Sequence, residues 1–307
     1  MEQLAKPAWT TAPSAGRRAL WLMLLFALSW TLLEGVVGAQ FQNQYHLLQI
    51  VWCRYAVHLL AVWLIWGRRD PAPLWRTRRP VFHALRSLCM LVMPLSFAMA
   101  VYGGMPGHTV WALFWAAPLL ILVLARGWLG ERVPLAAWLA AALGGVAAVL
   151  LLGLARPINT SLLVWPLAMA ASFAVYVAMT RQLRDEAVHT NLFHTAAGVF
   201  LVLTLFMPSV WVTPSWHDVV VLIGIGLFGL LGLWALDRAC EAAPLSAATP
   251  MLFLHLAGMF AIESLARGAA PSARQALALA LIVLVLLTVW HASASARGAY
   301  PIPMKGK

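Results

Sequence analysis

Ionisable side chains inside long apolar stretches are the residues of this sequence that are most able to do chemistry. Glu34 and Arg54 interrupt the first two such stretches, residues 19–39 and 47–66. A charge inside a membrane costs about 3 kcal/mol and persists where it is paired or hydrated. At about 1.5 Å of rise per residue the two side chains have nearly matching depths. This predicts either an ion pair that fixes the helix orientation or a role in binding or gating.

Two histidines could carry a proton, because imidazole titrates near neutral pH. His58 follows Arg54 by one helical turn, and His255 lies near the middle of the stretch 245–263. A single histidine on an apolar helix is more often a hydrogen-bonding group with a satisfied partner, so that alternative stays open. Proton coupling through Glu34 or these histidines is therefore a hypothesis.

Aromatic side chains could form a wall against which a planar or amphipathic solute packs. The candidates lie in three different apolar stretches: Trp30, Trp111, Trp115 and Tyr176. Tryptophan facing lipid is an equally good interpretation, because these stretches are apolar all round. Together with Glu34, Arg54 and His255, these four aromatic residues make up the predicted substrate-binding set.

Long apolar stretches must position all of these groups. Apolar residues make up 63% of the chain and charged residues 10%, against about 25% charged in ordinary globular proteins, which excludes a soluble domain. Only helices or closed barrels span lipid, and the period-two alternation of barrel strands is missing. The sequence predicts an all-α membrane protein with ten transmembrane helices, each near the about 20 residues needed: 19–39, 47–66, 82–102, 107–126, 134–155, 161–181, 190–208, 217–237, 245–263 and 273–293.

Basic residues gather in every second segment between these stretches. With the N-terminus inside, the inner segments hold 16 of the 21 lysines and arginines. Cytoplasmic loops of membrane proteins are rich in such residues, so both termini are predicted to be cytoplasmic. This placement explains the net charge of +11 without nucleic acid as a partner. Arginine outnumbers lysine 18 to 3, which indicates a high-GC bacterial genome and hence a multi-pass protein of the inner (plasma) membrane.

The second half of the chain is a faint copy of the first about 138 residues later, where Pro106 meets Pro244 and Gly130 meets Gly268. A repeat of five spans must be inverted in the membrane, and inverted repeats are typical of secondary transporters. The predicted organisation is a cytoplasmic tail, two five-helix repeats and a second cytoplasmic tail: residues 1–18, 19–155, 156–293 and 294–307.

Helix interruptions at matching positions of the two halves also indicate a solute pathway, because a broken helix frees backbone groups. At the same offset Pro94 of the third stretch meets Gly232 of the eighth. We therefore predict that Pro94 is a hinge and that it takes part in coupling or gating with Glu34 and His58.

The most specific pattern lies between Pro106 and Leu152. It contains Ala117-Pro118-Leu119, Leu129-Gly130-Glu131-Arg132 and Gly144-Gly145-Val146. With this pattern, nearly the whole chain resembles the drug/metabolite transporter superfamily of ten-helix permeases with two EamA-type repeats. The second repeat departs from the pattern, because Ala269 stands where glutamate is expected after Gly268. The resemblance implies a central cavity between the halves, lined by spans one, three, four, six, eight and nine.

Gly130 and Glu131 form a predicted structural joint. Gly130 can end the fourth helix in a left-handed cap, and Glu131 can favour the positive end of the fifth helix. Direct contact with a solute is the alternative.

These observations predict a secondary-active permease that exports a small organic metabolite or drug-like solute by alternating access, with direction resting on the family resemblance. An importer, a flippase for lipid-like solutes and a non-transporting membrane protein are the alternatives. Motifs for a nucleophile, a metal site or a nucleotide loop are missing, so we predict no enzyme, no cofactor and no metal. Proton coupling and a homodimer are further hypotheses.

Overall fold

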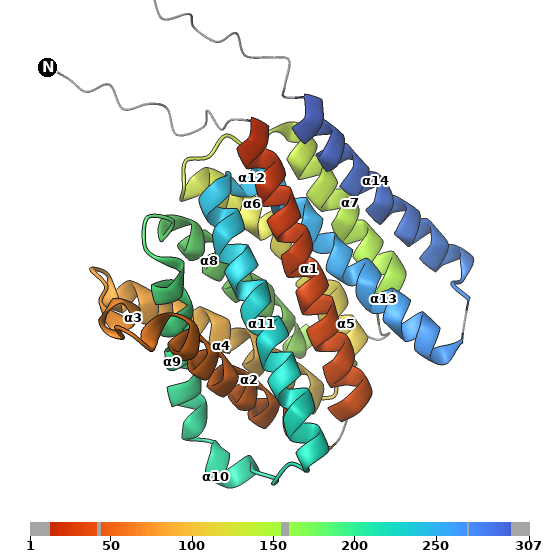
Figure 1. The fold of residues 1–307 in the computed structure, drawn as a ribbon. Coiled ribbons are helices and arrows are strands. Elements are labelled where there is room, and N and C mark those ends of the chain that lie inside the picture. Colours follow the sequence, from red (N-terminus) through yellow and green to blue (C-terminus); the bar gives the residue numbers. More distant parts are fainter. Residues whose placement is uncertain (1–12, 42–43, 155–159, 269, 296–307) are drawn as a thin grey trace, which may run out of the picture.

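The computed structural model describes residues 13–41, 44–154, 160–268 and 270–295, which form one bundle of helices (Figure 1). No β-strand occurs within these ranges. The elements in chain order are α1 (Pro13–Phe41), α2 (Leu47–Val62) continued by η1 (Trp63–Gly67), α3 (Ala72–Trp75), α4 (Pro80–Tyr102), α5 (Gly107–Phe114), α6 (Ala117–Gly127), α7 (Leu135–Leu152), η2 (Thr160–Leu163), α8 (Val164–Gln182), α9 (Val188–Thr204), α10 (Met207–Val210), α11 (Trp216–Ala242), α12 (Leu245–Ala248), η3 (Thr249–Leu252), α13 (Phe253–Arg267) and α14 (Ala273–Ser295).

Nine helical segments of the described chain are long and apolar enough to cross a membrane. The predicted stretch 190–208 differs, because α9 has 17 residues and ends at Thr204. Pro208 lies in the first turn of the separate helix α10, where its missing N–H is tolerated, whereas inside α9 it would remove a backbone hydrogen bond. The all-helical membrane fold is confirmed, and the remaining predicted span is a shorter apolar helix.

Long-range packing joins helices from the two halves of the chain. α1 packs against α11, α4 against α8, α2 against α9 and α7 against α14. The pairs α1–α11 and α7–α14 can be followed in Figure 1. α1 also contacts α13, and α8 also contacts α5 and α6. The core of the bundle therefore lies at the interface between the halves.

Glycines on α11 let neighbouring helices approach closely. A Cβ atom built on Gly226 would lie 2.5 Å from Cβ of Val57, and one on Gly229 would lie 2.9 Å from Nε2 of His58. Gly224, on the same helix, has open space around it. Small residues at such contacts allow helix backbones to pack tightly. Gly226 and Gly229 thus hold α2, with its polar side chains, against α11.

The observed helix breaks lie elsewhere than at the predicted hinge. α4 runs without interruption through Pro94, and α11 runs through Gly232. The fourth apolar stretch is instead divided into α5 and α6, and the ninth is divided into α12, η3 and α13. Pro118 lies in the first turn of α6 and Pro250 lies in η3, and because proline lacks an N–H it interrupts the helical hydrogen bonds at both places.

The joint after α6 links the two halves of the protein. Gly130 has φ +66° and Gly268, at the matching place after α13, has φ +61°, the left-handed region that favours glycine at a helix end. The carboxylate of Glu131 has hydrogen-bond partners outside α7. Its Oε2 accepts a hydrogen bond from the Leu245 backbone nitrogen at 2.8 Å, and its Oε1 accepts one from Nε of Arg181 at 3.1 Å. Both partners belong to the second half.

Candidate functional site

A cavity of about 810 Å³ lies inside the bundle. Its walls come from α1, α2, α4, α5, α8, α11 and α13, and its lining includes Gln44, Tyr45 and His46 of the α1–α2 connection. These helices include all six spans that the family resemblance implies, and α2 in addition. Residues of the opposite ends of the helices do not line it within the described chain. The cavity therefore runs from the middle of the bundle toward one end only.

The charged residues that line this cavity are Glu34 and Arg54. Glu34 Oε1 accepts a hydrogen bond from Nε1 of Trp30 at 3.3 Å. The Arg54 guanidinium carbon lies 5.1 Å from the ring centroid of Tyr55, and its Nε is buried without a hydrogen-bond partner. The two charges share one cavity, but they form no ion pair within 4.0 Å in the described chain. The ion pair considered from the sequence is thus not formed.

His58 also lines the cavity, one helical turn beyond Arg54. The side chain is 1% exposed, and neither ring nitrogen has a hydrogen-bond partner. Buried polar atoms are normally satisfied in folded proteins. The ring of His58 is packed against α11 beside the cavity, with Nε2 2.9 Å from a Cβ atom built on Gly229.

Trp30 is the centre of an aromatic cluster. Its ring stacks on His255 with a centroid distance of 4.4 Å and an interplanar angle of 8°. Phe173 lies 5.4 Å from Trp30 and Trp111 lies 6.2 Å away, measured between ring centroids. Trp30, Trp111 and Phe173 line the cavity, so one wall of the cavity is aromatic.

Trp115 and His255 lie behind this wall and do not line the cavity. Trp115 is 2% exposed and contacts the rings of Trp30 and Phe253. His255 Nδ1 lies 3.1 Å from the Thr31 hydroxyl. His255 is therefore a buried histidine with a hydrogen-bonding partner, and both residues support the wall from outside.

Tyr176 lies in a second polar cluster toward the other end of the bundle, centred on Arg86. The Arg86 guanidinium is 0% exposed and donates from Nη2 to Asp237 Oδ1 at 2.7 Å and to Tyr176 at 3.0 Å. Its remaining nitrogens donate to Thr180 and Thr195 and to the carbonyl of Asn191. Arg86 belongs to α4, and all of its partners belong to α8, α9 or α11. This cluster therefore ties the two halves together.

Sequence reasoning missed this cluster. Arg86 and Asp237 are not among the predicted site residues, although both are buried, with Asp237 4% exposed. One signal was available. Arg86 lies near the start of the third apolar stretch and Asp237 at the end of the eighth, and in the predicted topology both of these ends lie on the same side of the membrane. The two stretches are also equivalent in the predicted repeat.

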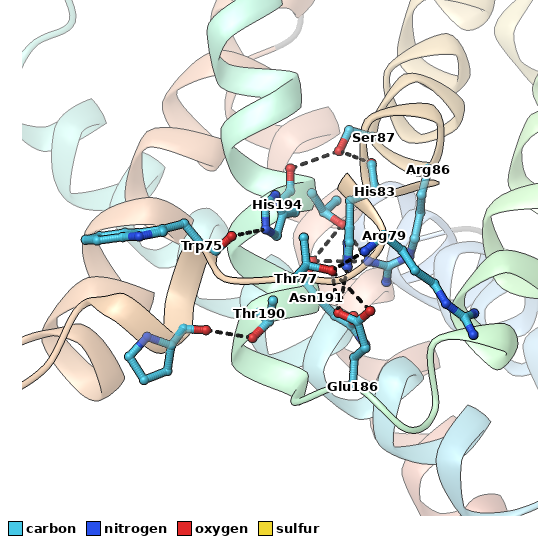
Figure 2. Close-up of polar contacts among 12 residues, drawn as sticks. Trp75, Thr77, Arg79, His83, Arg86, Ser87, Glu186, Thr190, Asn191 and His194 are labelled. Atoms are coloured by element: carbon cyan, nitrogen blue, oxygen red, sulfur yellow. Dashed lines mark hydrogen bonds and ion pairs between the residues drawn. The ribbon is translucent and has the colours of Figure 1, made fainter. Parts of the chain in front are cut away.

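Next to this cluster, a second set of contacts fixes the connection between α8 and α9. Figure 2 shows Glu186 between His83 and Thr77, with His83 Nε2 3.0 Å from Glu186 Oε2 and the Thr77 hydroxyl donating at 2.9 Å. Although burial acts in the opposite direction, hydrogen bonds from His83 and Thr77 hold the pKa of Glu186 below its ordinary value. His83 also stacks on His194 at 4.5 Å. These contacts again join the first half to the second.

Glu131 and Arg181 complete the same end of the bundle. Arg181 is 7% exposed, and besides its ion pair with Glu131 it donates from Nη1 to the carbonyl of Cys240. Burial raises the pKa of Glu131, while the charge of Arg181 opposes this rise. Three sets of polar contacts between the halves therefore close this end.

The predicted site residues thus fall into two groups. Those lining the cavity are Trp30, Glu34, Arg54, His58, Pro94 and Trp111. Those outside its lining are Trp115, Tyr176, His255, Gly130 and Glu131. Residues at the mouth were not predicted: Tyr102 bonds His46 at 3.0 Å, and Tyr45 donates to Asp218 at 2.8 Å. In the described chain no group of three or more histidine, cysteine, aspartate or glutamate residues could hold a metal ion.

No family model matches the sequence. It is 27% identical over 183 residues to the S-adenosylmethionine uptake transporter of Rickettsia conorii, covering 59% of this chain, and the chain spans 62% of the length of that relative. It is also 27% identical over 232 residues to the riboflavin transporter of Vibrio cholerae, covering 73% of this chain and 74% of the relative.

A solved crystal structure shares the fold, with a TM-score of 0.71 and 22% sequence identity, covering 91% of this chain and 99% of the other. The similar bacterial proteins are named as transporters. Within the described residues, nine helices are long and apolar enough to cross a membrane. The chain is therefore a multi-pass membrane protein that is similar to bacterial transporters of small molecules.

Proposed function

We propose that this protein is a secondary-active permease of a bacterial inner membrane that moves a small organic solute by alternating access. The cavity carries this proposal. It lies between helices of both halves, has the size of a small-molecule site, and holds an aromatic wall with a few polar groups.

We propose further that the chain consists of two inverted repeats of the DMT type, residues 19–155 and 156–293. The packing pattern supports this proposal. Exchanging each helix for its counterpart converts the α1–α11 contact into the α8–α4 contact, and converts α1–α13 into the contacts of α8 with α5 and α6. The pairs α2–α9 and α7–α14 are left unchanged. A two-fold axis in the membrane plane produces this pattern.

With both termini cytoplasmic, the mouth of the cavity faces outward and the Arg86 cluster lies on the cytoplasmic side. All three inner sets of polar contacts join the first half to the second. Opening toward the cytoplasm must separate these contacts, and closing the mouth must bring the outer ends together. Rocking of one repeat against the other around a fixed site would do both.

We propose uptake as the direction of transport, because the named function of the S-adenosylmethionine relatives is uptake. Export, expected from the family resemblance, is the alternative that an assay separates. Proton coupling through Glu34 or His58 stays a prediction.

Untargeted measurement of metabolites tests the proposal for any small organic solute. Cells expressing the wild-type protein and cells expressing Gly229→Leu are compared for metabolites inside the cells and in the medium. Leucine at Gly229 would overlap Leu33, Arg54 and His58, which line the cavity, and would displace them into it. The matched control is Gly224→Leu on the same helix, where the space is open.

Transport through the cavity is supported by a compound whose distribution between cells and medium is the same for the wild type and Gly224→Leu but different for Gly229→Leu. Equal distributions in all three strains at matched membrane abundance would refute it. The sign of the change separates uptake from export.

A further inference from the structure

Opposite charges face the same cavity without a direct ion pair, although the charge of Arg54 acts on Glu34 across the cavity. We infer that the cavity binds a zwitterionic solute, whose cationic group lies at Glu34, whose anionic group lies at Arg54, and whose flat apolar part packs on Trp30 and Trp111. This inference rests on the proposed function and specifies its substrate class.

Arg86 and Arg181, the two buried arginines of the described residues, provide a comparison. Arg86 pairs with Asp237 at 2.7 Å, and Arg181 pairs with Glu131 at 3.1 Å. Removing a charge from water without a partner is unfavourable, and this chain avoids it at both places. Glu34 and Arg54 lie on adjacent helices around one cavity. Charges left unpaired there are available to a ligand.

The surroundings of each charge favour this assignment. Trp30 donates to one oxygen of Glu34, so the carboxylate is oriented while its second oxygen keeps its acceptor capacity. Arg54 presents a planar fork of donors, which suits a carboxylate or phosphate group. Gly229 provides the space beside it.

His58 lines the inner part of the same cavity, with both of its ring nitrogens buried. The Trp30 ring is fixed by stacking on His255. A rigid aromatic wall lowers the entropy cost of binding a flat group.

Net charge complementarity excludes solutes with a single charge as preferred ligands. A pure anion would bind Arg54 but would be repelled by Glu34. A pure cation would bind Glu34 but would be repelled by Arg54. Specificity of this kind comes from repulsion as well as attraction. A solute carrying both charges is the class that satisfies both groups together.

Three related probes test the inference on the purified full-length protein: L-tryptophan with both charges, tryptamine with the positive charge, and indole-3-propionate with the negative charge. Affinity is measured by calorimetry in detergent. The wild type is expected to bind tryptophan at least about tenfold more tightly than either analogue. Equal or weaker binding of tryptophan, or no binding of any probe, would overturn the inference.

Two variants add an internal control, because each should favour a different analogue. Glu34→Gln should strengthen binding of indole-3-propionate relative to tryptophan, and Arg54→Gln should strengthen binding of tryptamine. Arg267→Gln, at an exposed ion pair, should keep the wild-type order. Parallel loss of all probes in both cavity variants would indicate a structural role for these charges and would contradict the inference.

The metabolite comparison described above separates this inference from the proposed function. A transported compound that carries a single charge, or none, would refute the zwitterion assignment and leave the permease proposal intact. A transported zwitterion would support both.

Discussion

Replacing Asp237 by asparagine should open the cytoplasmic side of the protein. Asp237 is the counter-charge of Arg86, which is fully buried and forms no other ion pair in the described chain. Removing one partner of a buried pair costs about 3–5 kcal/mol, because the other charge stays buried. This cost falls on the state in which the inner contacts are formed. The ratio of inner-closed to inner-open molecules should therefore fall by a factor of about 10² to 10⁴.

Cys240 provides a native reporter for this change. It is 2% exposed, and its carbonyl is bound by Arg181 at the inner end. In a background with Cys53→Ser and Cys89→Ser, the rate of Cys240 labelling by a membrane-permeable maleimide measures inner opening. Asp237→Asn should raise this rate by at least about tenfold. The double change Arg86→Gln with Asp237→Asn should restore part of the slow rate, because no unpaired charge remains.

Glu241→Gln is the matched control. It breaks an exposed ion pair with Arg238, one helical turn from Asp237, and exposed pairs contribute about 0–1 kcal/mol. Its labelling rate should equal that of the parent. An unchanged rate in Asp237→Asn, with normal membrane abundance and thermal stability, would refute the assignment of this pair to inner closure.

Three further predictions concern packing, pH and coupling. Gly144→Ala should destabilise the protein by about 1–3 kcal/mol, because the new Cβ would overlap the Phe253 ring of α13, whereas Gly145→Ala should not lower the melting temperature. Glu186 has a lowered pKa, so its contribution to stability is complete above its unfolded pKa of about 4.3 and is lost as pH falls through the lower folded value. In this acid range Glu186→Gln should make the melting temperature less dependent on pH. The exposed Asp185→Asn should leave that dependence unchanged. If Glu34 carries a coupled proton, Glu34→Gln should abolish the pH dependence of transport, and an unchanged pH profile would refute that role.

Sequence reasoning could predict the bundle because the membrane makes simple demands on composition. Each span needs a long apolar run, and the bounds of the observed helices follow the predicted stretches closely. The exceptions involve proline. Pro208 separates α10 from the end of α9, and Pro118 and Pro250 divide the fourth and ninth stretches. A hydropathy pattern counts apolar residues and does not register such breaks.

The candidate site was partly predictable for a different reason. Glu34, Arg54 and His58 are conspicuous as polar residues inside spans, and all three line the cavity. Arg86 and Asp237 were equally polar, yet their pairing joins residues 151 positions apart. Helices that are apolar all round do not indicate which face meets which neighbour. The shared end of the two stretches could therefore suggest this pair but not establish it, and the positions of Trp115 behind the aromatic wall and of Tyr176 beside Arg86 could not be deduced.

Transport by membrane vesicles tests the central claim most directly. Vesicles containing the wild type, Gly229→Leu or Gly224→Leu are loaded with a bacterial metabolite extract, and the compounds that leave are identified over time. The wild type and Gly224→Leu should release at least one small organic compound faster than empty vesicles, and Gly229→Leu should not. Release at the rate of empty vesicles for every compound, with correctly folded protein present, would contradict the account.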